Sequence, residues 1–422
     1  MGAERVHGVD GRGSIRGLRY HAPAARALYL HIPFCVKKCA YCDFASWATP
    51  HGTPILKHYA HALAWLVDDA GYAGLLDEAV TAYIGGGTPT MLGEWLAPLV
   101  EAVTRWVDVR ELSVEANPES VDAQRLLELG SVGATRISIG VQSLVSAELR
   151  SLGRIHGVER ARKALAEAVA AGFDVSADLI CGIPGQTAES WRRSVEGVLS
   201  AGVGHLSVYP LSIEEGTPLA RRIVLGKAKP PDEDLQALLM EDAARIASAH
   251  GMERYEVASY AAPSKESRHN LAYWTAQPYL GLGTGAASML TREAYGRLRA
   301  IAPQLPALSP DTARVRLTMS ADRHQIVLSH RISGLPFEVE ELGMRQAVAE
   351  DLMLAARMSA GIDDGLAGLA REVLGAARVD AALDGLVNRG LLAAGEGGSF
   401  APTHAGWLLG NELYGVLWSL AD

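Results

Sequence analysis

The chain has 422 residues, of which 49% are hydrophobic and 21% are charged, and its formal net charge at pH 7 is −9. This length accommodates two or three domains with a sizeable core, and the acidic balance argues against broad non-specific binding of nucleic acid. The sequence shows no run near the roughly 20 apolar residues of a membrane span and no secretory leader of the usual kind, so we expect a cytoplasmic protein.

Between residues 27 and 209, short strand-like runs alternate with helical patterns, after a lead-in at residues 1–25. Residues 1–25 carry scattered Arg and Gly, and we expect a flexible segment there. Short apolar runs of β type then alternate with helical patterns such as 159–171 and 188–201. Strands are expected at 27–32, 80–84, 112–116, 136–141, 175–181 and 205–209. Six strands alternating with helices predict an α/β fold, a partial (β/α)6 TIM-like barrel over residues 26–225, with its chemistry at the C-terminal strand ends.

The remainder of the chain has a different pattern. Pro230 and Pro231 precede an amphipathic helix expected at 232–250, and residues 255–289 are rich in Tyr, Trp and Gly. The segment 301–335 is strand-like, with many Pro and Ser residues. Helices expected at 344–358 and 379–389 precede a short strand, a Gly-rich turn and a last helix at 404–420. We therefore predict a middle region at 226–335 and a C-terminal α+β winged-helix-like domain at 336–422.

Three of the four cysteines lie within eight residues, directly after the first expected strand. Cys35, Cys39 and Cys42 have the spacing CxxxCxxC, and Cys181 lies about 140 residues further on. Soft thiolates suit iron–sulfur clusters, and three thiolates on a four-iron cubane leave one iron open to an exogenous ligand. The alternative is a structural zinc site, which usually takes four protein ligands. We expect Cys181 to be a buried, unreactive thiol.

The cysteine segment resembles a known signature. Residues 31–44 read HIPFCxxxCxYCDF, which is similar to radical S-adenosylmethionine (SAM) proteins and, in this fuller form, to the anaerobic coproporphyrinogen III oxidase family with its HemW-type haem chaperones. The resemblance extends from about residue 27 to 420. It implies a redox-active [4Fe-4S] cluster on Cys35, Cys39 and Cys42. It also implies adenosylmethionine bound through its amino and carboxylate groups at the open iron, and cleaved to a 5′-deoxyadenosyl radical on reduction.

Later motifs resemble the binding shell that this family builds around adenosylmethionine. Glycines after the second strand let backbone approach a ligand closely. An acidic residue after the third strand suits the ammonium or ribose hydroxyls, and a guanidinium suits the methionyl carboxylate. Read singly, each polar residue is equally a cap or a surface residue; their order at successive strand ends supports binding. The predicted shell consists of Tyr41, Gly86, Gly87, Thr88, Glu115, Gln142, Arg154 and Asp178.

Two features favour the chaperone branch over the oxidases. Phe44 stands where the oxidases carry a further cysteine, in the pattern CxxxCxxCxC, and only about 26 residues precede the first strand, fewer than in the oxidases. His269, Tyr273 and Trp274 match the HNxxYW motif of the chaperone branch. The resemblance implies His269 as an axial haem ligand, with the two aromatic rings stacked on the porphyrin. The alternative for His269 is a surface histidine beside a core tryptophan.

The sequence thus predicts a haem chaperone that binds haem, a [4Fe-4S] cluster and S-adenosylmethionine and transfers haem to acceptor proteins. The alternative is a radical SAM enzyme, either similar to the oxidase or a methyltransferase, and no catalytic residue is singled out. The partners that the resemblance implies are haem and haem-accepting proteins, with respiratory enzymes as one candidate class. A homodimer is left open, and neither nucleic acid nor a membrane span is expected.

Overall fold

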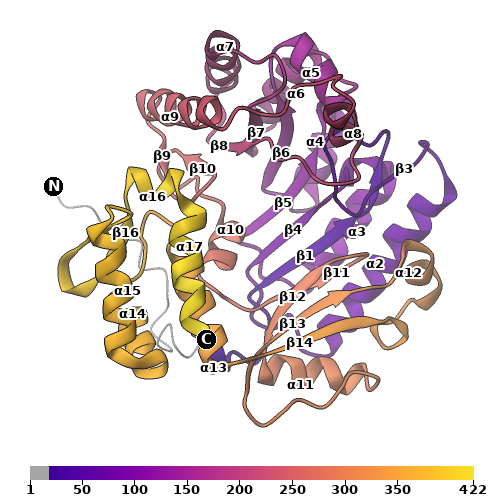
Figure 1. Cartoon of the computed structure of the whole chain (residues 1–422). Helices are drawn as coiled ribbons and strands as arrows, with labels where there is room; N and C mark the ends of the chain where they lie inside the picture. The colour runs from indigo at the N-terminus through magenta and orange to yellow at the C-terminus, as the bar shows by residue number, and fades with distance from the viewer. Residues whose placement is uncertain (1–18) are drawn as a thin grey trace.

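The structure, a computed structural model, describes residues 19–422 (Figure 1). The segment 1–25, predicted to be flexible, lies mostly outside the described residues. Its last part differs from that prediction, because residues 19–25 are packed into the folded body. Tyr20 and Ala25 are buried, and the Tyr20 hydroxyl donates to Asp351 over 2.5 Å.

One twelve-stranded sheet forms the body of the protein, in the order β14-β13-β12-β11-β1-β4-β5-β6-β7-β8-β10-β9. Its centre consists of six parallel strands: β1 (Ala27–Ile32), β4 (Thr81–Gly86), β5 (Glu111–Ala116), β6 (Arg136–Gln142), β7 (Asp174–Cys181) and β8 (His205–Pro210). These are the six strands expected from the sequence. The expected α/β arrangement of parallel strands is therefore observed.

Helices cover the outer face of these strands (Figure 1). They are α2 (Pro54–Tyr72), α3 (Leu96–Thr104), α4 (Ala123–Ser131), α6 (Val158–Ala170), α7 (Ala188–Leu199) and α9 (Glu233–Ala249). Two further helices, α5 (Ser146–Leu152) and α8 (Pro218–Val224), pack instead beside Ala40 and Tyr41 through Leu152 and Leu219. In β1, the side chains of Leu28, Leu30 and Ile32 are fully buried, whereas Tyr29 is partly exposed. Parallel strands covered by helices read as apolar runs, which is why the sequence pattern located them well.

The sheet continues past the barrel strands on both edges, and the sequence did not predict this. β11 (Tyr279–Leu282) pairs parallel with β1, and β12 (Ala287–Thr291), β13 (Thr312–Met319) and β14 (Phe337–Gly343) follow as antiparallel strands. At the other edge lie β10 (Ser259–Ala261) and β9 (Glu253–Arg254). The helices of this region are α10 (Arg268–Trp274), α11 (Arg292–Ile301) and α12 (Arg323–Ser329).

The expectation that 301–335 is strand-like is wrong for most of the segment. Only β13 is a strand, and α12 follows it. The start of α12 is fixed by Asp322, whose carboxylate accepts hydrogen bonds from the backbone amides of His324 and Gln325. Such a cap satisfies donors at the first turn that a helix leaves unpaired, and it favours a helix over a strand here.

Residues from α13 onward form a second hydrophobic core. The elements are α13 (Met344–Ala355), α14 (Asp364–Ala370), α15 (Ala376–Asn388), the hairpin of β15 (Leu392–Ala394) and β16 (Phe400–Pro402), α16 (His404–Leu408) and α17 (Gly410–Trp418). The single helix expected at 404–420 is divided into two at Leu409. The winged-helix assignment and the domain boundaries stay predictions. Within residues 19–422, none of the helices combines the length and apolar character that crossing a membrane requires.

Candidate functional site

The cysteine loop follows the C-terminal end of β1 and folds back on itself. β2 (Phe34–Cys35) pairs with β3 (Trp47–Ala48). His31 anchors the loop, because its Nε2 lies 2.9 Å from the Ala45 carbonyl and its Nδ1 lies 2.9 Å from the Tyr29 hydroxyl. The thiols of Cys35, Cys39 and Cys42 are partly buried. The loop therefore presents three thiols on one short, internally bonded segment.

Two polar side chains and one glycine surround these sulfurs. Arg154 Nη1 lies 3.4 Å from Cys39 Sγ, and the Thr88 hydroxyl donates to Cys35 Sγ over 3.7 Å. A Cβ on Gly87 would lie 3.0 Å from Cys35 Sγ, so only glycine fits beside this sulfur. Burial raises the pKa of the Cys35 and Cys42 thiols. Iron binding, which needs thiolates, would therefore release protons from this loop.

The surroundings of the thiols fit an anionic cluster. Cluster thiolates require nearby donors and free space. Here a guanidinium lies beside one sulfur, a hydroxyl donor lies beside another, and a glycine tract leaves room. Within residues 19–422, no group of three His, Cys, Asp or Glu side chains is arranged to hold a single metal ion. A four-iron cubane is larger than one ion, so its ligands do not converge on a point. Cys181 is buried in β7, away from solvent, and burial raises its pKa to about 12.

The glycine tract at the end of β4 is held against the loop and against Glu115. Gly86 has a φ of +113°, and a Cβ there would lie 2.6 Å from the His31 ring. Both the positive φ and the nearby His31 ring exclude a side chain at this position. The Gly86 amide donates to Glu115 Oε2 over 2.9 Å. The tract therefore brings the end of β4, the end of β5 and the cysteine loop together.

Two acidic side chains lie on the inner face of the barrel. Glu115 Oε1 accepts from the Tyr83 hydroxyl over 2.7 Å, and Asp178 Oδ2 accepts from the Ser138 hydroxyl over 3.1 Å. Burial raises the pKa of Glu115 to about 7, although the hydrogen bonds from Tyr83 and Gly86 lower it. Burial also raises the pKa of Asp178 to about 6. A cationic ligand would be stabilised between them, because it favours the ionised form of both carboxylates.

Arg154 connects the cysteine loop to the ends of β5 and β6. Besides Cys39, it donates through Nη2 to the Gly140 carbonyl over 2.6 Å and to the Asn117 side chain. The Asn117 amide donates in turn to the Thr88 hydroxyl over 2.8 Å. Asn117 was not among the predicted site residues, although it follows Glu115 by two residues at one polar strand end. Its role depends on a contact between strands, which sequence spacing does not reveal.

The other predicted shell residues lie close to this group. Gln142 ends β6 at a register irregularity, with a φ of +65°, and a Cβ on Gly140 would lie 2.8 Å from its Nε2. Tyr41 packs against the buried cluster that contains Leu152. Burial raises the pKa of the Tyr41 hydroxyl, and the nearby Arg154 charge partly offsets this effect. The structure therefore gathers the residues predicted to bind adenosylmethionine at one end of the barrel.

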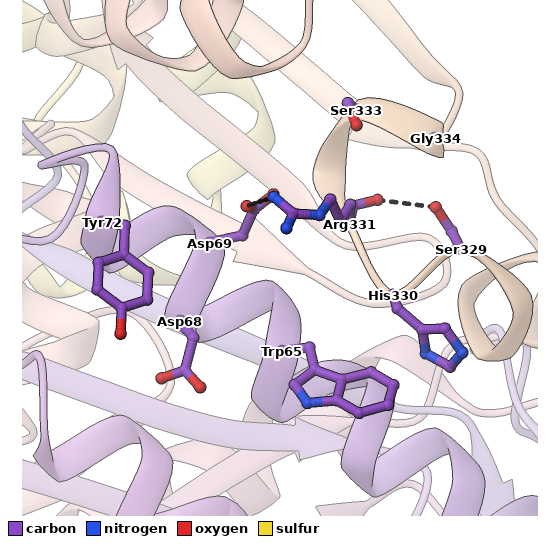
Figure 2. A pocket seen from close by; sticks show the side chains of 9 residues that line it. All are labelled: Trp65, Asp68, Asp69, Tyr72, Ser329, His330, Arg331, Ser333 and Gly334. Carbon is purple, nitrogen blue, oxygen red and sulfur yellow. Dashed lines mark hydrogen bonds and ion pairs between the residues drawn. The ribbon is translucent and has the colours of Figure 1, made fainter.

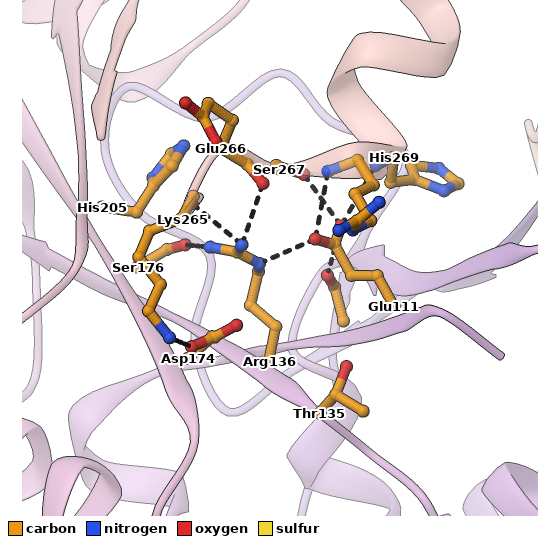
Figure 3. A network of polar contacts seen from close by, with 12 residues as sticks. Glu111, Thr135, Arg136, Asp174, Ser176, His205, Lys265, Glu266, Ser267 and His269 are labelled. Atoms are coloured by element: carbon orange, nitrogen blue, oxygen red, sulfur yellow. Dashed lines mark hydrogen bonds and ion pairs between the residues drawn. The ribbon is translucent and has the colours of Figure 1, made fainter. Parts of the chain in front are cut away.

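The helix that carries the HNxxYW motif lies at the opposite end of the strands. Glu111, at the start of β5, accepts hydrogen bonds from the Ser267 hydroxyl and from the amides of Arg268 and His269, over 3.0 to 3.1 Å (Figure 3). Arg136 Nε pairs with the same carboxylate over 3.1 Å, and both side chains are buried. This buried ion pair fixes the N-terminus of α10 beneath the barrel.

His269 itself is 1% exposed in this conformation, and its assignment as an axial haem ligand stays a prediction. Its Nδ1 lies 3.2 Å from the Thr81 hydroxyl and its Nε2 lies 3.0 Å from the Tyr273 hydroxyl. The ring stacks on Tyr83 with centroids 5.2 Å apart, and burial lowers the His269 pKa to about 3. Neither nitrogen is free to bind iron in this conformation. The alternative expectation, a surface histidine, is wrong because the side chain is buried.

An open groove of about 570 Å³ lies away from these residues, between α2 and the segment after α12 (Figure 2). It is lined by Trp65, Tyr72 and His330, and it is crossed by Asp69 and Arg331, whose charged atoms are 3.5 Å apart. None of the residues predicted to bind a cofactor lines this groove.

The chain is similar in sequence to one family model and to several known proteins. Residues 29–197 match the family model of the Radical SAM superfamily. The heme chaperone HemW of Bacillus subtilis strain 168 is 30% identical over 407 residues, which cover 93% of this chain and 98% of that relative. The heme chaperone HemW of Mycobacterium tuberculosis strain H37Rv is 40% identical over 266 residues, or 61% of this chain and 68% of the relative.

A solved structure supports the fold. The coproporphyrinogen III oxidase HemN of Escherichia coli, described as a radical SAM enzyme, superposes with a TM-score of 0.71 over 97% of this chain and 92% of its own. Its sequence identity is 20%, so this likeness concerns the fold alone.

Proposed function

The chain belongs to the HemW family within the radical SAM superfamily, and we propose that it is a haem chaperone that binds haem, a [4Fe-4S] cluster and S-adenosylmethionine and transfers haem to acceptor proteins. The observation that carries this proposal is the 30% identity to a heme chaperone over 98% of that relative's length. Shared sequence over nearly the whole chain covers the barrel, the middle region and the C-terminal core together.

Cys35, Cys39 and Cys42 would hold the cluster. The proposal is supported by their place on one loop and by the Arg154 guanidinium 3.4 Å from Cys39 Sγ. When bound, such a cluster supplies an electron and an open iron for the amino and carboxylate groups of the nucleoside. Gly87 keeps the space beside Cys35 free for it.

The remaining shell residues would orient the nucleoside. Glu115 and Asp178 hold negative charge on the inner face of the barrel, where the ligand's cationic centre and ribose hydroxyls would lie. Arg154 would pair with the methionyl carboxylate, since a guanidinium has five donors and those bonded in the structure are directed to three partners. Backbone groups of Gly86 to Thr88, with Gln142 and Tyr41, would complete the pocket.

The oxidase alternative lacks a matching side chain in the cysteine loop. Phe44 is 61% exposed at the end of the loop, and its ring carries no sulfur or polar atom that could bind a metal or move a proton. The likeness to the oxidase structure concerns the fold. We therefore favour the chaperone over oxidative decarboxylation. We also propose that the protein acts in the cytoplasm, that its acceptors include respiratory enzymes, and that the functional unit is monomeric or a homodimer.

The deciding experiment uses the full chain, purified and loaded with iron and sulfide without oxygen. We expect stoichiometric haem binding and transfer of that haem to a haem-free b-type cytochrome, without consumption of adenosylmethionine in step with transfer. Cys39→Ala should lose the cluster, and Cys181→Ala is its matched control. A cluster-loaded protein that binds no haem and converts coproporphyrinogen III would show that this proposal is wrong.

A further inference from the structure

The outer face of α10 meets the C-terminal core. Leu271 and Trp274 pack against that core, while His269 on the same helix faces the barrel. The two parts are also joined by a β-bridge between Glu256 and Met358 and by a hydrogen bond from the Ser359 amide to the Tyr255 carbonyl over 3.0 Å. Trp274, from the motif that the site described above does not use, therefore lies at a junction between the middle region and the C-terminal helices.

Two guanidinium groups are layered on aromatic rings at this junction. The Arg357 guanidinium carbon lies 4.4 Å from the centre of the Tyr414 ring and 5.5 Å from that of the Trp274 ring. The Arg254 guanidinium carbon lies 5.1 Å from the centre of the Trp407 ring. Aromatic faces attract cations, so the rings help to hold both guanidinium groups. Arg254 Nη2 also donates to the Tyr260 hydroxyl, which leaves its Nη1 without a partner among the described residues.

Four buried polar atoms at this junction have no hydrogen-bond partner among the described residues. They are Arg254 Nη1, Trp274 Nε1, Arg357 Nε and the Tyr414 hydroxyl. Residues 19–422 contain ten such side-chain atoms in all, and these four lie together. All four can donate a hydrogen bond, and leaving buried donors unpaired costs free energy.

The charge at the junction is unbalanced. Glu256 is the acidic group beside these cations, and its carboxylate already accepts from the Ala258 amide over 3.1 Å. Trp274 Nε1 approaches this carboxylate without the geometry of a hydrogen bond. Burial raises the pKa of the Tyr414 hydroxyl, and the Arg357 and Arg254 charges partly offset that effect. The Arg254 charge acts on this carboxylate, and the Arg357 guanidinium on the Tyr414 and Trp274 rings adds a second positive charge. Positive charge with spare donors suits an anionic ligand with oxygen acceptors.

We propose that Arg254, Trp274, Arg357 and Tyr414 form a carboxylate-binding site, and that it receives the propionate carboxylates of haem. This rests on the proposed haem-binding function and adds an anchor for the haem periphery that is separate from any iron ligand. The aromatic rings supply flat surfaces for a conjugated ligand, and the guanidinium groups supply paired donors for its acid groups. The four donor atoms are buried in this conformation, so binding requires the side chains of Arg357 and Tyr414 to move.

The test compares haem with haem dimethyl ester, whose carboxylates are blocked, on the full cluster-loaded chain. We expect the unmodified protein to bind haem at least about tenfold more tightly than the ester, since a charge-assisted pair is lost. Arg357→Gln should reduce this preference to about twofold or less and leave ester affinity unchanged. Lys57→Gln is the matched control: its ammonium nitrogen lies 4.6 Å from the centre of the Trp95 ring, and neither residue belongs to the cysteine loop or to this junction.

The outcomes separate this proposal from the one on which it rests. If the protein binds haem but binds the ester equally well, the carboxylate site is wrong while the chaperone function stands; a site for acidic side chains of a partner protein would give this result. If haem and ester both fail to bind, the proposed function fails first. Should Arg357→Gln not fold, Tyr414→Phe retains the ring and removes one spare donor. It should reduce the preference by less than Arg357→Gln, and an unchanged preference counts against the site.

Discussion

The hydrogen bond from Tyr83 to Glu115 predicts how the affinity for adenosylmethionine depends on pH. The ligand carries a permanent sulfonium charge, so it binds better to the ionised carboxylate. Because burial raises the pKa of Glu115 to about 7, affinity should rise as the pH increases through 7 and level off above it. Tyr83→Phe removes the 2.7 Å bond that favours the ionised form. The Glu115 pKa should then rise further, and the midpoint of the affinity profile should move to higher pH.

The size of this shift follows from the strength of the bond. A hydrogen bond to a charged group contributes about 1.5–3 kcal/mol, and one pKa unit corresponds to 1.36 kcal/mol. The midpoint should therefore move upward by about 1–2 pH units. At pH 7, where Glu115 in the unmodified protein is about half ionised, the Tyr83→Phe protein should bind the ligand roughly 5–50-fold more weakly. The difference should largely vanish at the highest pH, because both proteins are then ionised.

The assay is equilibrium dialysis of adenosylmethionine against cluster-loaded protein, without oxygen, between pH 6 and 9. Titration of the ligand itself cancels when the variant is compared with the unmodified protein in the same buffers. Tyr295→Phe is the control, because its hydroxyl donates to the Pro306 carbonyl over 2.8 Å and not to Glu115. Equal midpoints for Tyr83→Phe and the unmodified protein, or an affinity that is flat across this range, would refute the reasoning.

Three further predictions concern the cluster, the glycine tract and the C-terminal core. Cys35→Ala, Cys39→Ala and Cys42→Ala should each lose bound iron and visible absorption, whereas Cys181→Ala should keep both; loss of iron in Cys181→Ala would contradict its assignment to the core. Gly87→Ala should also lose the cluster, because a Cβ there lies 2.7 Å from the Phe34 carbonyl oxygen, and Gly157→Ala, with nothing within 4 Å, should retain it. Arg314→Met should lower the free energy of unfolding by about 3–5 kcal/mol, since buried Glu350 and Asp351 lose a partner at 3.0 and 2.7 Å. Arg316→Met, at a half-buried position on the same strand, should lower the free energy of unfolding by about 1 kcal/mol or less. Denaturant titration measures both variants, and equal losses would show that burial of the ion pair is not the cause.

The part of the fold that the sequence predicts well is the part that local pattern determines. The six barrel strands are buried on both faces, so each appears as an apolar run with a clear end, and their limits fall within two residues of the structure. β9 to β14 are short or alternating in pattern and therefore ambiguous alone, and β11 takes its place by parallel pairing with β1, far earlier in the sequence. The sheet was therefore predicted too narrow, and α12 was missed inside a segment that contains several Pro and Ser residues.

The site divides in the same way. Residues at the ends of strands, such as Glu115 and Gln142, could be located from the sequence because parallel strands end at a common edge. Tyr83 and Asn117 could not, because their roles come from contacts between side chains of neighbouring strands and not from a motif position. His269 shows that a sequence motif does not predict which way a side chain faces. The pattern identified the residue, but only the packing of α10 under β4 shows that its imidazole faces inward.

The position of α10 separates two tasks that the sequence placed in one motif. The inner face of the helix carries His269, whose ring rests on Tyr83, and the Tyr83 hydroxyl holds Glu115 of the proposed nucleoside pocket. The outer face carries Trp274, which lies against Arg357 and the C-terminal core. A change at the pocket that moves Tyr83 must therefore act on the same short helix that contributes to the proposed carboxylate site. Since coupling between two sites is reciprocal, haem bound at the outer face should alter the affinity for adenosylmethionine by the same factor as adenosylmethionine alters the affinity for haem, and Tyr83→Phe should weaken both effects together.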